Sequence, residues 1–329
     1  MDTFKGFEAQ LYAVNDHSFE NIALSLFRYQ SASNDLYRRY IGHLGVDPGQ
    51  IISLNQIPYL PISLFKRHRI QTGTWTAEKE FCSSGTTEGT VSRHYIRDFQ
   101  FYLRNARRCF EHFFGDPAGY HFLALLPSYL ERSESSLVAM MHYFIEESRS
   151  PHSGFYLHNY EKLIRDAEAL RHGNRTVMVW GVAFALLDLA ERFQPDLSHS
   201  LVIETGGMKG RRPEITRNEL HQILRKSLNV GKIRSEYGMT ELLSQAYSME
   251  EGAFFCPPGL KVVVRDVTDP LEKGIHRPGA LNFVDLANFH SIAFVETEDL
   301  GEIHNDGSFS VVGRLDNSDV RGCNLLVNQ

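Results

Sequence analysis

The sequence predicts an α/β protein built on mostly parallel sheets flanked by helices, with a β-rich C-terminal subdomain. From Glu78 onward, short apolar runs alternate with longer amphipathic stretches, which is typical of parallel strands joined by crossover helices. After Tyr237 the pattern changes to short segments rich in Val, Phe and Gly. These segments indicate either a small β-rich subdomain or an extension of the sheet edge.

The N-terminal part of the chain has the composition of a helical layer. Residues up to about Tyr40 are rich in helix formers, and apolar residues are dense enough over 19–27 for a partly buried helix. A segment punctuated by Pro58 and Pro61 follows and is typical of an irregular connection. We therefore expect an N-terminal helical layer over residues 1–57, a core domain over 58–312 and a short tail over 313–329.

Individual elements of the core domain follow from the apolar pattern. Helices are predicted where amphipathic stretches separate the apolar runs, and Thr216 followed by Glu219 is a capping-box pattern for one of them. The predicted strands of the parallel sheet are residues 80–82, 121–126, 176–180, 201–204 and 232–236. The predicted helices are residues 98–114, 135–147, 183–193 and 217–228. The C-terminal β-segments are residues 261–264, 281–284 and 308–312.

Composition excludes several classes of function. The chain has 329 residues, with 34 Lys and Arg against 40 Asp and Glu, and no dense basic run, so we do not expect nucleic acid as a partner. No apolar run approaches the roughly 20 residues of a membrane helix, and the N-terminus does not resemble a signal peptide. We expect a cytoplasmic protein without a membrane span. Its four cysteines are far apart, which predicts free thiols and no structural zinc site.

A glycine- and hydroxyl-rich loop follows the first predicted strand. Residues 81–90 read Phe-Cys-Ser-Ser-Gly-Thr-Thr-Glu-Gly-Thr. Such a loop can direct backbone N–H groups and hydroxyls at a polyphosphate, although it lacks the Gly-Lys-Ser/Thr ending of a Walker A loop. Alone, this composition is more typical of a solvated turn. The candidate phosphate-binding residues are Ser83, Ser84, Gly85, Thr86 and Thr87.

Together with three later segments, this loop resembles the adenylate-forming ligases, whose first signature is a Ser-Gly-Thr-Thr-Gly loop. Residues 235–241, Ser-Glu-Tyr-Gly-Met-Thr-Glu, are similar to the family's Tyr-Gly-x-Thr-Glu signature. Residues 297–301, Thr-Glu-Asp-Leu-Gly, are similar to its Thr-Gly-Asp-Leu-Gly segment, with Glu298 in place of the first Gly. Residues 313–316, Gly-Arg-Leu-Asp, resemble its Gly-Arg-x-Asp hinge.

The resemblance implies ATP and Mg²⁺ and assigns a role to several side chains. Tyr237 is expected to stack on adenine, Thr240 to contact the α-phosphate and Glu241 to hold magnesium. Asp299 is expected to bind the ribose hydroxyls, which Arg314 also reaches. These residue types suit such roles, since carboxylates are hard ligands and arginine is a permanent cation. Each has an ordinary alternative as a core aromatic, a turn former or a surface charge, but four segments in the family's order favour a nucleotide site.

Three glycines complete the expected ATP site. Gly238 belongs to the same signature as Tyr237. Gly206 and Gly207 follow a predicted strand at the place where the family has glycines against the adenine, although a plain turn explains them equally well. Residues 126–129, Leu-Pro-Ser-Tyr, occupy the place of a family segment that lines the acyl pocket.

The sequence departs from the family in two respects. A typical member has a further C-terminal domain of about a hundred residues with a catalytic lysine, whereas this sequence ends at Gln329, so we expect that domain to be lacking. The lysine of the first loop is missing as well. Some cation has to offset the charge of the departing pyrophosphate. The candidates, each of which has the alternative of a surface charge, are Arg93, Lys209, Arg211 and Arg212.

A short ligase of this pattern resembles the LuxE-type acyl-protein synthetases of bacterial fatty acid reductase. Members of that group transfer the acyl group to a cysteine near their own C-terminus. The tail here reads Asp-Val-Arg-Gly-Cys-Asn-Leu-Leu over residues 319–326, which implies Cys323 as the acyl acceptor. A thiolate attacks an acyl adenylate readily, and Arg321 is placed to lower the thiol pKa. The alternatives are a cysteine packed in a terminal strand and Cys82 as a rival thiol.

The resemblance thus implies an adenylation core over 58–312 and a hinge-like tail over 313–329. The expected substrate is a fatty or other hydrophobic carboxylic acid, and the expected recipient of the acyl group is an acyl-CoA reductase-like partner. Two alternatives stay open: a conventional ligase that delivers to coenzyme A or a carrier protein, and a catalytically weak nucleotide-binding scaffold.

Overall fold

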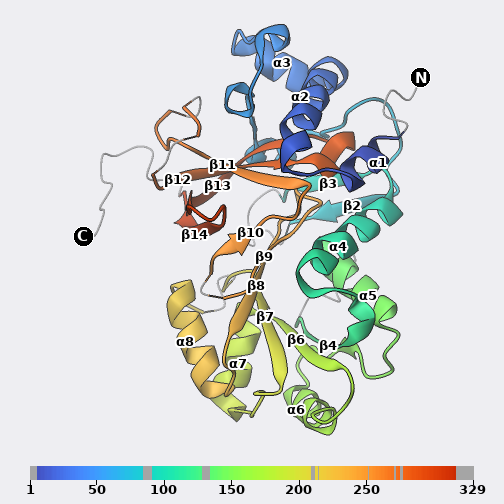
Figure 1. Cartoon of the computed structure of the whole chain (residues 1–329), viewed down its shortest axis with the longest axis vertical. Coiled ribbons are helices and arrows are strands. Elements are labelled where there is room, and N and C mark those ends of the chain that lie inside the picture. Colours follow the sequence, from blue (N-terminus) through green and yellow to red (C-terminus); the bar gives the residue numbers. More distant parts are fainter. Residues whose placement is uncertain are drawn as a thin grey trace.

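A twelve-stranded mixed sheet runs through the molecule (Figure 1). The computed structural model describes residues 6–83, 91–127, 134–208, 212–213, 215–250, 252–269, 272–274 and 277–315. The strand order is β11-β12-β13-β14-β10-β9-β8-β7-β6-β4-β5, with β1 beside β13. Strands β4 to β8 pair in parallel and form the parallel half of the sheet. Strands β9 to β14 pair in antiparallel fashion and form the antiparallel half.

Four of the five strands predicted from the alternation of apolar runs and helical stretches lie in the parallel half, which also contains the short strand at residues 154–155 that the sequence did not predict. Helices α7 and α8 pack together on one face of it, whereas α4 and α5 pack together on the other (Figure 1). The capping box at Thr216 begins α8, as predicted. The strands are β4 (Tyr120–Leu125), β5 (Gly154–Phe155), β6 (Thr176–Val182), β7 (Ser200–Thr205) and β8 (Ile233–Tyr237). The helices are α4 (Phe99–Phe114), α5 (Ser136–Ser148), α6 (Tyr160–Ala169), α7 (Ala183–Phe193) and α8 (Arg217–Ser227).

The antiparallel half continues the same sheet beyond β8. The C-terminal β-segments are therefore an extension of the sheet edge, which is one of the two arrangements that the sequence left open. Strand β1 (Leu60–Pro61) pairs with β13 in parallel, so the proline-rich connection is tied to this half. Its other strands are β9 (Ala246–Ser248), β10 (Phe254–Phe255), β11 (Leu260–Arg265), β12 (Gly279–Asp285), β13 (Phe294–Ile303) and β14 (Phe309–Arg314).

Helices α1 (Phe7–Tyr12), α2 (Asp16–Ser33) and α3 (Asp35–His43) form the predicted N-terminal layer at the antiparallel end of the molecule (Figure 1). Asn15 caps the N-terminus of α2, because its side chain accepts hydrogen bonds from the N–H groups of residues 17 and 18. Its apolar face is buried, and Phe27 contacts Phe294 of β13 edge-on at 5.9 Å between ring centroids. The boundary at residue 57 stays a prediction. Short 3₁₀ helices complete the fold: η1 (Pro48–Gln50), η2 (Leu54–Gln56), η3 (Ile62–Lys66), η4 (Pro117–Gly119) and η5 (Leu286–His290).

One predicted strand is paired differently from what we expect. Strand β2 (Lys79–Cys82) pairs antiparallel with β3 (Arg93–Ile96) in a separate two-stranded sheet, so its assignment to the parallel sheet is wrong. The apolar run predicted the strand but not its partner. A short connection permits a hairpin, whereas a parallel partner requires a crossover of about a dozen residues or more.

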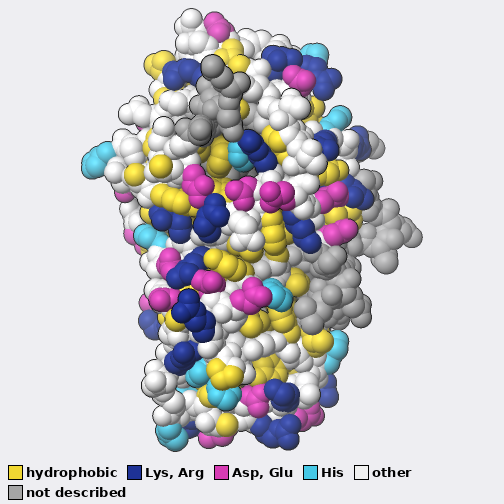
Figure 2. Space-filling model, turned by 90° about the vertical axis from the view of Figure 1, so that its right-hand side faces the viewer, with side chains coloured by type: hydrophobic (Ala, Val, Ile, Leu, Met, Phe, Trp, Pro, Cys, Tyr) yellow, Lys and Arg dark blue, Asp and Glu magenta, His cyan; other side chains and the backbone are white. Residues whose placement is uncertain are grey.

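Aromatic side chains fill the core of the parallel half. The ring of Phe110 lies 5.6 Å from that of Phe122, 5.0 Å from that of Phe144 and 6.3 Å from that of Trp180, all measured between centroids. Figure 2 shows acidic and basic side chains interspersed over the outer face that it presents. In the described residues, none of the helices is both long and apolar enough to cross a membrane.

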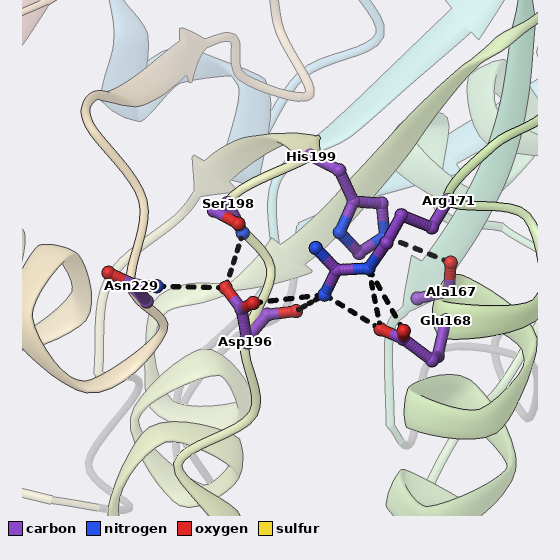
Figure 3. A network of polar contacts seen from close by, with 7 residues as sticks. All are labelled: Ala167, Glu168, Arg171, Asp196, Ser198, His199 and Asn229. Carbon is purple, nitrogen blue, oxygen red and sulfur yellow. Dashed lines mark hydrogen bonds and ion pairs between the residues drawn. The ribbon is translucent and has the colours of Figure 1, made fainter.

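A polar cluster ties together the loops at the amino ends of the strands (Figure 3). Arg171 donates to the carboxylate of Asp196 at 3.0 Å, and Asn229 donates to the same carboxylate at 2.9 Å. These contacts hold the chain that leads into β7 and β8. The polar cluster lies at the opposite edge from the carboxyl ends of the strands, which is where open parallel sheets bind ligands.

Gly301 provides a test of the packing between β13 and β14. A Cβ at this position lies 2.0 Å from the carbonyl oxygen of Ser310, at a point where the register of the two strands shifts. We expect Gly301→Ala to lower the free energy of unfolding by about 1–3 kcal/mol or more, because backbone has to move. Gly313→Ala is the matched control, since nothing lies within 4 Å of its Cβ position. Urea denaturation followed by circular dichroism measures both, and equal stabilities would contradict the packing described.

Candidate functional site

The carboxyl ends of β7 and β8 carry two of the predicted signatures side by side. Strand β7 pairs with β8 in parallel up to Thr205 and Glu236. Gly206 and Gly207 follow β7 and are exposed, and Gly206 has a φ of +65°, a left-handed conformation that favours glycine. Gly238 is exposed directly after β8. Both glycine turns therefore lie at the edge of the sheet where an open α/β fold binds ligands.

Tyr237, Asp299 and Arg314 meet although they are far apart in the sequence. The hydroxyl of Tyr237 donates to Oδ2 of Asp299 at 2.6 Å. Asp299 and Arg314 are paired across β13 and β14, with Arg314 Nε 3.9 Å from Asp299 Oδ1. Arg314 also lies 3.3 Å from the carboxylate of Glu298, and 65% of its side chain is exposed. The structure thus brings together the three side chains that the resemblance assigns to the nucleoside.

Tyr237 is at the same time part of the core. Its ring stacks on Phe283 with centroids 5.2 Å apart and meets Phe254 and Phe309 at their edges. Only 8% of the residue is exposed. Stacking on adenine stays a prediction, and only the small exposed part of the side chain is open to a ligand.

The segment after β8, which contains Thr240 and Glu241, is fixed through its backbone. His94 Nδ1 lies 2.8 Å from the carbonyl oxygen of Thr240, and Asn288 donates to that of Glu241 at 2.8 Å. The N–H groups of residues 243 and 244 donate to the buried carboxylate of Asp285 at 2.8 and 2.9 Å. Thr240 itself is half-buried. We call residues 240–244 the signature loop, and buried polar partners hold it at several points.

Glu241 is a buried carboxylate suited to a cation. Only 5% of it is exposed, and this burial raises its pKa, while the Ser92 hydroxyl and the charge of Arg314 act in the opposite direction. A carboxylate that is desolvated in this way is stabilised in its ionised form by a positive charge. A hard oxygen ligand of this kind fits Mg²⁺. Among the described residues, no group of three or more His, Cys, Asp or Glu side chains is arranged to hold a metal ion.

The base of the hydroxyl-rich loop is next to the signature loop. Ser83 and Ser92 are joined by two hydrogen bonds of 3.0 Å, one from the Ser83 N–H to the Ser92 carbonyl and one from the Ser92 N–H to the Ser83 hydroxyl. Two residues further on, His94 contacts Thr240. The hairpin of β2 and β3 therefore opens beside Thr240 and Glu241. The predicted residues Ser84, Gly85, Thr86 and Thr87 lie outside the described residues, as does Cys323.

The four candidate cations are distributed as follows. Arg93 forms an ion pair with Glu80 across the hairpin, and Arg212 forms ion pairs with Asp188 and Glu191 of α7. Lys209 and Arg211 lie outside the described residues. The two described candidates are therefore held by carboxylates.

Arg217, the first residue of α8, is a cation of the site that sequence reasoning missed. It lies 3.0 Å from the buried carboxylate of Glu204 and 4.8 Å above the ring of Phe254. Burial raises the pKa of Asp299, and the charge of Arg217 is among the influences that oppose this rise. No motif marks this position, because the residues that Arg217 contacts come from distant strands.

The three described cysteines are poor nucleophiles at neutral pH. Burial raises the thiol pKa of Cys82 to about 12, and the acidic side chains Glu80 and Glu134 add to the effect. Burial also raises the pKa of Cys109 to about 12 and that of Cys256 well above its usual range. Since the thiolate is the reactive form, Cys82 is disfavoured as the acyl acceptor.

Comparison with known proteins identifies the fold. No family model matches the sequence, and a search of curated proteins finds no match. ATP-bound MatB from Rhodopseudomonas palustris is similar in structure, with a TM-score of 0.53 and 16% identity over 71% of this chain and 47% of that one. The luciferase-like enzyme from the nonluminescent mealworm Zophobas morio has a TM-score of 0.51 and 16% identity over 75% of this chain and 60% of that one.

The chain shares the fold of these structures, which agrees with the adenylate-forming-ligase architecture that the sequence predicted. An ATP-bound chimera of MatB, RpMatB-BxBclM B1, gives a TM-score of 0.54 with 17% identity over 71% of this chain. The chain spans about half the length of the MatB structures, with 47% of their residues covered. These likenesses establish the fold class.

His94 gives the stability of the protein a specific dependence on pH. Burial lowers its pKa from 6.5 to about 4, so the folded protein keeps this imidazole neutral at pH values where the unfolded chain protonates it. The unfolded state then binds more protons, and stability falls as the pH decreases from about 6.5 towards 4. This residue alone should cost about 2 kcal/mol between pH 7.5 and 5. Urea denaturation at both pH values should show a loss smaller by that amount in His94→Asn, and an unchanged loss would contradict the prediction.

Proposed function

We propose that this chain activates a carboxylic acid with ATP as an acyl adenylate and then holds the acyl group as a thioester on Cys323. The observation that carries the proposal is the contact of Asp299 with both Tyr237 and Arg314 at the carboxyl end of β8, together with the charge of Arg314 that acts on Glu241 of the signature loop. The base of the hydroxyl-rich hairpin opens at the same place. The likeness of the fold to ATP-bound MatB supports the same class of reaction.

Each group then has a role in binding ATP. The Asp299 carboxylate accepts hydrogen bonds from ribose hydroxyls, with Arg314 beside it, and Tyr237, Gly206 and Gly207 contact the adenine. Thr240 and the hairpin hydroxyls donate to the phosphates. Glu241 would hold Mg²⁺, whose chemistry is to neutralise phosphate charge.

Two displacements follow on the bound substrates. A carboxylate oxygen of the acid attacks the α-phosphorus, the bond to the bridging oxygen breaks, and pyrophosphate leaves. The Cys323 thiolate then attacks the acyl carbonyl, and AMP leaves with the electron pair of the broken C–O bond. Leu315, which is hydrogen-bonded to Glu298 at 2.6 Å, is eight residues from Cys323. A fully extended chain of that length spans about 29 Å, so the thiol is able to reach the nucleotide site.

The substrate class and the partner rest on the resemblance. A fatty or other hydrophobic acid is the proposed substrate, and an acyl-CoA reductase-like protein is the proposed recipient of the acyl group.

A labelling experiment tests both steps. The protein is incubated with ATP, Mg²⁺ and radiolabelled acids of different chain length, and covalent label is measured before and after neutral hydroxylamine, which cleaves thioesters. We expect wild-type protein and Cys82→Ala to be labelled. Cys323→Ala should lose the label while acid-dependent exchange of pyrophosphate into ATP continues.

The other outcomes separate the competing functions. Label that persists in Cys323→Ala contradicts this cysteine as the acceptor. Pyrophosphate exchange in wild-type protein without covalent label indicates a conventional ligase that needs coenzyme A or a carrier protein. No exchange with any acid contradicts the adenylation step and favours a nucleotide-binding scaffold.

A further inference from the structure

A chain of buried polar contacts leads from the N-terminal helical layer to the signature loop. Asn34, between α2 and α3, donates to the carbonyl oxygen of Ser291 at 3.0 Å, and the Thr72 hydroxyl donates to the same oxygen at 2.5 Å. The Ser291 hydroxyl is 2.9 Å from His94 Nε2, and His94 Nδ1 is 2.8 Å from the carbonyl oxygen of Thr240. All four side chains in this chain of contacts are buried.

The partners fix the tautomer of His94. A backbone carbonyl can only accept, so Nδ1 carries the proton and donates it to Thr240. Nε2 of the neutral ring is then an acceptor, and the hydroxyl of Ser291 donates to it. Each atom has a single role, and a ring that is only 1% exposed has no water to replace either partner.

A second arm reaches the next carbonyl of the signature loop. Asn288 of η5 donates to the carbonyl oxygen of Glu241 at 2.8 Å. Gln30 of α2 holds η5 in turn, because its amide donates to the carbonyl oxygen of Asn288 at 3.1 Å and accepts from the N–H of Ala293 at 3.0 Å. The two arms thus begin at Gln30 of α2 and at Asn34 directly after it, and they end at the consecutive carbonyl oxygens of residues 240 and 241.

We propose that His94 and Asn288 are positioning residues that together hold the backbone of Thr240 and Glu241. The proposal rests on the proposed function, because it assigns these residues to the alignment of the α-phosphate contact and of the magnesium ligand. A displacement of about 1 Å in such groups is enough to lower a rate about 100-fold. Both residues act through the backbone carbonyl oxygens that they contact.

Two substitutions of His94 separate its contacts. The amide nitrogen of asparagine takes the place of Nδ1, so His94→Asn keeps a donor for Thr240. The amide of glutamine reaches the place of Nε2, so His94→Gln keeps the contact with Ser291 and loses the contact with Thr240. His121→Asn is the matched control, because His121 is also buried but contacts Ser150 near the amino end of β4.

We expect acid-dependent pyrophosphate exchange in His94→Asn to keep a kcat within about threefold of wild type. In His94→Gln the kcat should fall about 10–100-fold, with a smaller change in the KM for ATP, because an aligned group matters most in the transition state. His121→Asn should keep the wild-type kcat whatever its thermal stability. A purely structural role would instead make loss of activity follow loss of stability across all three variants, which would overturn the proposal.

Hydrogen–deuterium exchange tests the contact between His94 and Thr240 independently of enzyme activity. The amides of residues 240–244 should exchange faster in His94→Gln than in His94→Asn, while the amides of β6 and β7 stay unchanged in both. Equal protection of residues 240–244 in the two variants would overturn the proposal even if the protein adenylates acids. Faster exchange in His94→Gln together with no pyrophosphate exchange in wild type would support the contact and reject the proposed function.

Discussion

The hydrogen bond between Tyr237 and Asp299 joins the two halves of the sheet, and the candidate site depends on it. Tyr237 ends the last strand of the parallel half, whereas Asp299 and Arg314 belong to paired strands of the antiparallel half. A parallel half alone provides glycine turns and a threonine at its carboxyl edge. The antiparallel extension adds a carboxylate and a guanidinium at the same edge, and this combination suits a ribose and a phosphate.

The electrostatics of the site follow from this burial. Desolvation raises the pKa values of both Glu241 and Asp299, and the charge of Arg314 opposes the rise at each of them. The ionised form of a buried carboxylate is stabilised most by a ligand that supplies a cation or hydroxyl donors. The proposed magnesium at Glu241 and the proposed ribose at Asp299 would each meet that condition.

Local patterns were enough to predict much of the fold, and nonlocal contacts were not. The capping box at Thr216, strands β4, β6, β7 and β8, and the C-terminal strands β11, β12 and β14 all follow from residues close together in the sequence. The pairing of β2 with β3 was missed because an apolar run does not specify its partner. His94 and Thr240 are 146 residues apart in the sequence, and Gln30 and Asn288 are 258 residues apart. Periodic patterns in the sequence predict local elements, so they do not predict these two contacts. Arg217 was missed for the same reason.

In the proposed function, one nucleotide binds beside Tyr237, Asp299 and Arg314, with the signature loop close to its phosphates. Isothermal titration calorimetry with ATP and Mg²⁺ tests it on wild type, Asp299→Asn and the control Asp306→Asn, which changes an exposed carboxylate in the turn between β13 and β14. The loss of hydrogen bonds to a charged group should weaken binding about tenfold or more in Asp299→Asn and leave Asp306→Asn unchanged. Equal affinities for all three proteins, or no binding to wild type, would contradict the account.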